Sequence, residues 1–419
     1  MFGVVEFLSF NIMQLQSISG LENLPLSEIA VPDLLKGQLA LVLILLIGLV
    51  IGIIFKYWKD RRIWVYYQDT PQNREIVKVL NPLIKRYSPT VYLPLSIMKM
   101  YLSTDRKIPL LDVYMRMDVT LADGEVCALD WYPRNYKTMA EDTPIVFYVP
   151  GVFGVSKDKY AYHFCKICYK TLGWRTFVYN RRLLLLEPKG NKLNSYECSA
   201  DWKEVVDTVK RQFPRADIYL VGVSMGALNS QRYLIDYSEN SGIKAAVTIS
   251  SPWNAKKASD HIKGHKLFLK VLLAAQMKMV KQHMHSEKFL ELLEKKGIDI
   301  NKVLSSKSNR EFDQNFALPD LTLEHTDLYY ERLSTDTKLD QVRIPLLSIN
   351  SMDDILIPPS QVPLEQIKQN ANIIQLMVSG GGHIEYYHTI KRKYWAYMAC
   401  MEYFRYISKH PAHPIISQD

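Results

Sequence analysis

The chain has 419 residues, of which 48% are hydrophobic and 23% are charged. This composition excludes a disordered or low-complexity chain and suits one large domain or two ordinary ones. The five cysteines are scattered apart from Cys165 and Cys168, so we expect buried thiols on a helix rather than disulfides or a zinc site. The formal net charge of +9 lies in the body, since residues 1–62 hold five basic and five acidic side chains. Such a body is expected to be drawn to anionic lipid headgroups, and no nucleic-acid motif is present.

Leu39 begins an unbroken apolar run that ends at Phe55 and is followed by Tyr57 and Trp58. The run is near the lower length limit for a membrane span, and aromatic residues often anchor a span at the interface. No cationic segment opens the chain and no small-residue cleavage site follows the run, which favours an uncleaved anchor over a signal peptide. A buried core helix is the alternative, but the run has no polar face. We predict a transmembrane anchor over residues 39–58, after an N-terminal segment of residues 1–38.

The charges on the two sides of this run differ in sign. Acidic residues predominate before it, and Lys56, Lys59, Arg61 and Arg62 follow it. The positive-inside rule then places the C-terminal body on the cytosolic side. The lack of an Asn-x-Ser/Thr acceptor agrees with this orientation. We predict a single-pass protein of an endomembrane whose body faces the cytosol.

Beyond the anchor, residues 59–110 are rich in Pro and Tyr and are expected to pack on the surface of the body. The stretch 87–94 within them has no helical period. Two alternating stretches, 115–121 and 126–131, flank an Ala-Asp-Gly turn and predict a hairpin. Apolar strands then alternate with helical patterns, which predicts a mostly parallel α/β sheet with flanking helices over residues 111–419. The expected strands are 144–149, 174–179, 217–223, 244–250, 344–350 and 372–378, with an amphipathic helix over 201–213.

A Gly-x-Ser-x-Gly turn joins the strand ending at residue 223 to a helical pattern. This arrangement is typical of a nucleophile elbow, in which Ser224 stands at the tip of a strained strand-to-helix turn. Gly222 and Gly226 would crowd each other in such a turn, and only a missing side chain relieves that contact. An exposed Gly/Ser loop is the alternative, but the strand before the turn and the helix after it favour the elbow.

A serine nucleophile needs a base, and the base needs a carboxylate to orient it. Asp353 and Asp354 directly follow one late strand, and His383 follows the next after three glycines. Ligands bind where parallel strands end, so these side chains are expected to meet Ser224. The chain order Ser, Asp, His is that of α/β-hydrolases. We choose Asp354 as the acid because it stands four residues before Pro358, and Asp353 is the alternative.

Two backbone N–H groups are expected to form an oxyanion hole. One belongs to Met225, directly after the nucleophile, and the other to Val152 in the loop that follows strand 144–149. His383 and Glu385 alone suggest a metal, but no third ligand is near in the sequence. We predict neither a metal nor an organic cofactor.

Residues 255–330 lie between two core strands, carry no strand pattern, and predict a helical lid. Within it, residues 264–285 are largely apolar, and four lysines fall within about a third of the helical wheel. Such a basic amphipathic helix suits a membrane surface, although an ordinary cap over a pocket would show the same pattern. Both interpretations can hold together. The lysines are Lys266, Lys270, Lys278 and Lys281.

Motifs over about residues 85–405 form a set far more specific than the elbow alone. They are Tyr87-x-Pro-Thr, Ala122-Asp-Gly124, Leu129-Asp-Trp131, Pro150-Gly-x-x-Gly154-x-Ser156, Gly222-Val-Ser-Met-Gly226, Trp253-Asn254, Arg310-Glu-Phe-Asp313, Asn350-Ser-x-Asp-Asp354 and Gly381-Gly-His-Ile384. Together they resemble the YheT-like branch of the α/β-hydrolase domain proteins, which holds N-terminally anchored lipid esterases and phospholipases. The resemblance implies an α/β-hydrolase fold with a helical lid, preceded by one transmembrane helix.

The family's triad falls on Ser224, Asp354 and His383. The resemblance also implies hydrolysis of carboxylic esters, including acyl chains of phosphatidylcholine and monoacylglycerols. One departure is Asn180-Arg-Arg-Leu183, where the family usually has Asn-x-Arg-Gly. Loss of this glycine predicts a lost turn and an altered pocket wall.

We therefore predict a monomeric, membrane-anchored serine hydrolase that cleaves lipid esters through an acyl-enzyme. A catalytically silent interaction protein is an alternative, but a scaffold has no need for a complete triad. An acyltransferase is another, although the stretch from His383 to His388 lacks the His-x-x-x-x-Asp pattern of such relatives.

Overall fold

A computed structural model describes residue 48 and residues 62–85, 113–193, 196–197, 199–384, 386–388 and 393–410. The chain divides into two units, residues 1–59 and 60–419, and every element below belongs to the second. The predicted anchor at 39–58 falls almost wholly outside the described residues and stays a prediction. Among the helices of the described ranges, none has both the length and the hydrophobicity that a bilayer crossing requires.

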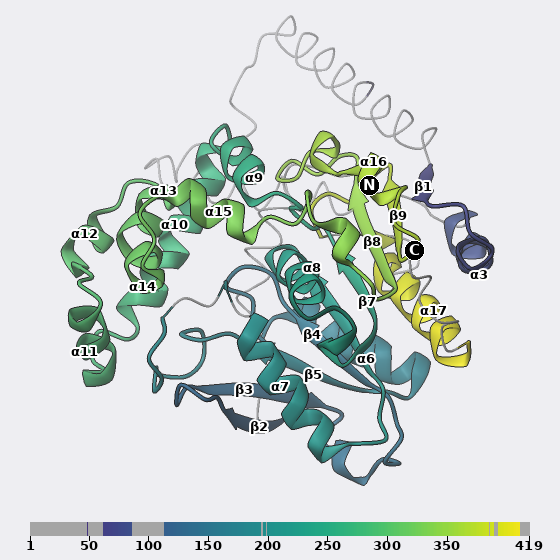
Figure 1. The fold of residues 1–419 in the computed structure, drawn as a ribbon, viewed down its shortest axis with the longest axis horizontal. Helices are drawn as coiled ribbons and strands as arrows, with labels where there is room; N and C mark the ends of the chain where they lie inside the picture. The colour runs from purple at the N-terminus through teal and green to yellow at the C-terminus, as the bar shows by residue number, and fades with distance from the viewer. Residues whose placement is uncertain are drawn as a thin grey trace, which may run out of the picture. The chain divides into compact units, whose positions relative to one another are not determined.

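A nine-stranded sheet organises the described residues, with strand order β1-β9-β8-β7-β6-β4-β5-β3-β2 (Figure 1). The strands from β9 to β5 in this order are parallel, and the hairpin β2–β3 and strand β1 flank them in antiparallel pairing. The predicted parallel sheet and the hairpin are thus confirmed. The strands are β1 Ile63–Tyr67, β2 Met115–Thr120, β3 Val126–Tyr132, β4 Ile145–Val149, β5 Arg175–Asn180, β6 Ile218–Val223, β7 Ile243–Ile249, β8 Leu346–Ser351 and β9 Ile373–Val378.

Helices cover both faces of this sheet because its central strands are apolar on both sides. On one face of the sheet, Trp202, Val205 and Val206 are buried in a hydrophobic core. The other face packs Cys165 and Cys168 with the C-terminal helix, which confirms them as buried thiols on a helix. Each large side chain buried in this way contributes about 1.5–3 kcal/mol to stability. The helices are α3 Pro71–Lys85, α6 Lys159–Leu172, α7 Ser199–Gln212, α8 Met225–Tyr237 and α17 Trp395–Lys409.

Of residues 59–110, which we expected to pack on the surface of the body, the structure describes only residues 62–85, and the stretch 87–94 lies outside the described residues. Within 62–85, β1 extends the sheet by pairing Ile63 with Val378. Helix α3 follows and packs against α17, with Ile76 and Leu80 buried. The pairing with β9 supplies the hydrogen bonds and the burial of β1. The sequence of β1 does not alternate between apolar and polar residues, so it did not predict a strand.

Between β7 and β8 the chain forms a group of helices without a strand. Side-chain caps set several of their starts: Asn254, Ser286, Asp299 and Ser308 each accept a hydrogen bond from an N–H of the first turn. We call residues 255–333 the helical insertion. Its helices are α9 Ala255–Ile262, α10 Lys266–Lys281, α11 Glu287–Lys295, α12 Ile300–Ser305, α13 Asn309–Phe312, α14 Leu318–Leu321 and α15 Thr326–Leu333, with a π-helical turn at Asp313–Ala317.

The turn after β5 differs from the expectation that its missing glycine would abolish it. Leu183 adopts a φ of 64°, so a leucine holds the left-handed conformation that a glycine would hold at lower cost. This backbone strain costs about 1–2 kcal/mol. Burial of the Leu183 side chain against Val280 and Phe289 of the helical insertion offsets it. The Leu183 carbonyl also accepts hydrogen bonds from Gln282 Nε2 at 2.6 Å and His283 Nε2 at 2.8 Å.

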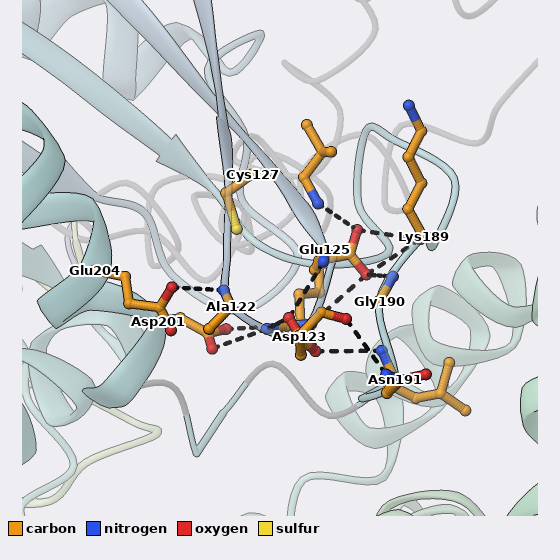
Figure 2. Close-up of polar contacts among 12 residues, drawn as sticks. Ala122, Asp123, Glu125, Cys127, Lys189, Gly190, Asn191, Asp201 and Glu204 are labelled. Carbon is orange, nitrogen blue, oxygen red and sulfur yellow. Dashed lines mark hydrogen bonds and ion pairs between the residues drawn. The ribbon is translucent and has the colours of Figure 1, made fainter.

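Arg182 lies beside this turn in a buried cluster of acidic groups. Its guanidinium donates to both carboxylate oxygens of Asp201 and to both of Asp123. Its Nη1 also lies 3.6 Å from Glu125 Oε2. Figure 2 shows these three acidic residues gathered around one point, with the backbone of Gly190 bonded to Glu125. Burial alone would lower the pKa of Arg182, and the hydrogen bonds to Asp201 and Asp123 reverse that effect. The cluster therefore ties the β2–β3 turn to the loop at residue 190.

Candidate active site

Ser224 stands between β6 and α8 in a strained backbone conformation, with φ 55° and ψ −121°. Two glycines make this turn possible. A Cβ at Gly222 would lie 2.3 Å from the Gly226 carbonyl oxygen, and one at Gly226 would lie 2.4 Å from the Val149 carbonyl oxygen. These distances are too short for any side chain, so the turn tolerates only glycine at both positions.

The structure brings Ser224, His383 and Asp354 into one hydrogen-bonded chain. Ser224 Oγ lies 2.7 Å from His383 Nε2, and His383 Nδ1 lies 2.8 Å from Asp354 Oδ2. The other carboxylate oxygen accepts hydrogen bonds from the N–H groups of Leu356 at 2.8 Å and Ile357 at 3.0 Å. A carboxylate at Nδ1 requires the proton on that nitrogen, so Nε2 is left to accept the serine proton.

Asp353 takes a different position from its neighbour. Its Oδ1 accepts hydrogen bonds from the N–H of Gly382 at 2.9 Å and from the Ser351 hydroxyl. Burial raises the pKa of Asp353 above the usual range of an aspartate. The carboxylate thus holds the loop that carries His383, while Asp354 contacts the imidazole itself.

The loop before His383 depends on glycine geometry. Gly381 and Gly382 have φ values of 156° and 55°, and a Cβ at Gly381 would lie 2.6 Å from the Tyr386 ring. The Ser250 hydroxyl contacts both the His383 carbonyl and, at 2.8 Å, the Tyr386 hydroxyl. Sequence reasoning missed Ser250, because a serine at the end of a strand has no feature that marks it as a support for a distant loop.

The two predicted oxyanion donors both lie at the cavity that contains Ser224. The Val152 loop approaches the nucleophile closely, since a Cβ at Gly151 would lie 3.3 Å from Ser224 Cβ. Met225 is the first residue of α8, where helix N–H groups are unpaired and the helix dipole favours negative charge. Neither the Val152 N–H nor the Met225 N–H donates a hydrogen bond to another residue in the described part of the chain.

The cavity beside Ser224 has a volume of about 670 Å³. This size is in the range of pockets that enclose small organic ligands. The helical insertion supplies much of its wall, so the insertion covers the nucleophile. Its lining is largely apolar and includes Phe153, Met225, Phe268, Leu269, Leu272 and Leu356.

One part of the cavity wall is polar. Asp313 Oδ2 accepts a hydrogen bond from the Tyr330 hydroxyl at 2.7 Å, and Asn309 donates to Gln276 Oε1 at 2.6 Å beside it. Burial raises the pKa of Asp313 to about 7. Asp313 belongs to the Arg310-Glu-Phe-Asp313 motif of the sequence. The sequence did not indicate its contact with Tyr330 or its place beside Asn309 and Gln276, because these groups come from separate helices of the insertion. Across the described residues, no set of three His, Cys, Asp or Glu side chains is arranged to hold a metal ion.

Comparisons with known proteins show which family the chain belongs to. The family model of the alpha/beta hydrolase fold matches residues 144–387. Phospholipase ABHD3 of Mus musculus is 32% identical over 292 residues, which cover 67% of this chain and 68% of that protein. Monoacylglycerol lipase of Saccharomyces cerevisiae is 24% identical over 203 residues, which cover 46% of this chain and 44% of that protein.

A solved structure of the Pyrococcus furiosus esterase Pf2001 is also similar, with a TM-score of 0.46 and 14% identity over 69% of this chain and 89% of that chain. The chain belongs to the alpha/beta hydrolase fold family, as the family match over more than half of its length shows. The resemblance to hydrolase-domain proteins with phospholipase members, which the sequence motifs predicted, is confirmed.

Proposed function

We propose that this protein is a membrane-anchored serine hydrolase that cleaves carboxylic esters of lipids, either a phospholipid acyl chain or a monoacylglycerol. Its family and its phospholipase and lipase relatives support its assignment as a serine ester hydrolase. The observation that carries the proposal is the Ser224–His383–Asp354 chain of hydrogen bonds at the edge of a large apolar cavity. An apolar cavity over a nucleophile suits an acyl chain better than a polar substrate.

In the proposed reaction, Ser224 Oγ attacks the ester carbonyl while His383 Nε2 takes its proton. The N–H groups of Val152 and Met225 would then stabilise the oxyanion of the tetrahedral intermediate. His383 returns the proton to the leaving alcohol, and an acyl-enzyme remains. Water, activated by the same imidazole, attacks the acyl-enzyme and releases the fatty acid. Asp354 keeps the imidazole in the tautomer that this cycle requires.

Membrane attachment would bring the cavity to its substrate. The apolar run at 39–58 supports an anchor, and its flanking charges support a body on the cytosolic side of an endomembrane. The surface of α10 supports a second contact with lipid. Leu267 is 74% exposed there, and Lys270 on the same helix is exposed as well. The same helix places Leu269 and Leu272 at the cavity, so it can act as lid and membrane contact together.

A fluorophosphonate probe tests the nucleophile directly. The full-length protein in detergent is expected to be labelled, and a Ser224→Ala variant is expected to lose the label. Hydrolysis of a panel of phosphatidylcholines and monoacylglycerols then identifies the substrate. A folded wild-type protein that takes no label would contradict the proposal and favour a silent interaction protein. Acyl transfer to an added alcohol at the expense of hydrolysis would favour an acyltransferase.

Protease protection in sealed microsomes tests the orientation. We expect the body to be digested without detergent, because it would face the cytosol. A body that resists digestion until detergent opens the vesicles would reverse the assignment.

A further inference from the structure

Arg181 and Arg182 are adjacent and both nearly fully buried, yet their partners differ completely. Arg182 is surrounded by the carboxylates of Asp123, Glu125 and Asp201. Arg181 is bonded to neutral oxygen atoms, and no described carboxylate forms an ion pair with it. A buried guanidinium loses hydration on folding, and here neutral groups alone compensate that cost. Arg181 therefore acts through hydrogen bonds to neutral groups and not through an ion pair.

The neutral partners of Arg181 belong to the two segments that carry the oxyanion donors. Its Nη1 donates to the carbonyl oxygens of Pro150 at 3.1 Å and Gly151 at 2.9 Å. Its Nη2 donates to Asn229 Oδ1 at 3.1 Å, in helix α8, which begins at Met225. The guanidinium therefore connects the loop of one donor to the helix of the other.

The contact with Gly151 acts on the Val152 N–H through a single peptide unit. The Gly151 carbonyl and the Val152 N–H belong to the same planar trans peptide, so they point in opposite directions. A hydrogen bond that fixes the carbonyl on the Arg181 side therefore fixes the direction of the N–H on the other side. A charged donor at the carbonyl also polarises the amide and strengthens its N–H as a donor.

The rest of the loop is held from other sides. The Gly151 N–H donates to the Tyr160 hydroxyl at 3.2 Å, and the Gly154 N–H donates to the Gly151 carbonyl at 3.0 Å. These bonds shape the turn but do not reach α8. Among these hydrogen bonds, only those of Arg181 join the loop to the nucleophile helix.

We propose that Arg181 is a positioning residue of the oxyanion hole, which it acts on by orienting the Gly151–Val152 peptide and joining it to α8. The inference rests on the proposed serine hydrolase function. Arg181 stands at the unspecified position of the Asn-x-Arg-Gly pattern. The alternative is that Arg181 serves stability only.

Arg175 offers a matched control for that alternative. Its guanidinium is also buried and also bonds to backbone carbonyls, those of Ala140 at 2.5 Å, Thr143 at 3.1 Å and Glu141 at 3.2 Å. None of these residues lines the cavity. An Arg175→Met change therefore removes a comparable set of bonds at a place without contact to the reaction.

The experiment compares wild type, Arg181→Met, Arg181→Lys and Arg175→Met as full-length proteins in detergent. For each we would measure urea unfolding, kcat and KM for a soluble p-nitrophenyl ester, and the rate of fluorophosphonate labelling. Loss of a whole oxyanion donor typically lowers kcat by about 10²–10³. A misdirected donor is expected to lower kcat and the labelling rate at least about tenfold in Arg181→Met, with KM changed by less than about threefold. Arg181→Lys, which keeps a cationic donor, is expected to regain part of the rate.

Arg175→Met is expected to lose stability to urea but to keep the wild-type kcat. The inference is overturned if Arg181→Met unfolds in the same range as Arg175→Met and retains wild-type kcat. It is also overturned if both variants lose the same fraction of kcat, because a general loss of stability would then explain both. If Arg181→Met does not fold, the test depends on Arg181→Lys. A lysine has one nitrogen in place of the two that bond Gly151 and Asn229, so an unchanged kcat in this variant would count against the inference. A wild type that is neither labelled nor active is a separate result, since it refutes the proposed function itself.

Discussion

Replacing Asp354 by asparagine tests the proposed triad most sharply, because the carboxylate uses both oxygens as acceptors. Oδ2 accepts from His383 Nδ1, and Oδ1 accepts from the N–H groups of Leu356 and Ile357. An asparagine has one oxygen and one NH₂ group. If its oxygen stays with the two N–H groups, its NH₂ must donate to Nδ1, which moves the imidazole proton to Nε2. His383 then presents a donor to Ser224 and cannot take its proton.

The opposite amide orientation in the Asp354→Asn variant is no better, since the NH₂ group would then face the N–H groups of Leu356 and Ile357 and leave donors opposed to donors. The orientation that keeps the two backbone hydrogen bonds prevents His383 from acting as the general base. The other orientation leaves His383 able to act but loses those two hydrogen bonds. The corresponding change in serine proteases lowers kcat about 10⁴-fold, which equals about 5.5 kcal/mol of transition-state stabilisation. We expect a loss of this order in kcat for a soluble ester, with the protein still folded by circular dichroism.

Asp353→Asn is the matched control. Its side-chain oxygen can still accept from the Gly382 N–H, so we expect kcat to fall less than about tenfold, the equivalent of about 1.4 kcal/mol. A larger loss from Asp353→Asn than from Asp354→Asn would refute the reasoning and make Asp353 the orienting acid. Retention of more than about a tenth of wild-type kcat by Asp354→Asn would also refute it.

Three further predictions follow from the packing. Leu183→Gly should be more stable than Leu183→Ala by about 1 kcal/mol in urea unfolding, because both lose the buried side chain but only glycine relieves the positive φ; the reverse order would contradict that conformation. Burial raises the pKa of Asp313 to about 7, so the folded protein holds that proton more tightly and the residue's contribution to stability falls as pH rises from about 4 to 7. The free energy of unfolding should fall with pH by up to about 1.4 kcal/mol per pH unit because of this residue, and Asp313→Asn should not show this fall. If the free energies of unfolding of the two proteins have the same pH dependence from about pH 4 to 8, the prediction is contradicted. Because burial raises the pKa of Cys165 and Cys168, neither thiol should react with iodoacetamide until the protein unfolds, and mass spectrometry of labelled peptides checks this.

The parts of the fold that could be predicted from the sequence are those with local signals. Uninterrupted apolar stretches such as 218–223 are buried strands because both sides of a parallel sheet are covered. The elbow around Ser224 could be located because its glycines are a steric requirement of the turn itself. Strand β1 escaped prediction because its pairing partner β9 lies far away in the chain, as the pairing of Ile63 with Val378 shows.

The sequence by itself determined the alternation of strands and helices, the strained serine turn, and the positions of an acid and a histidine after two late strands. These features arise from neighbours in the chain, so composition and spacing carry them. Only the tertiary structure decided which of two adjacent aspartates meets His383, because both follow the same strand and differ only in the direction of their side chains. It also decided that Arg181 joins the loop at Gly151 to α8, because those contacts form between segments that meet only when the sheet is assembled.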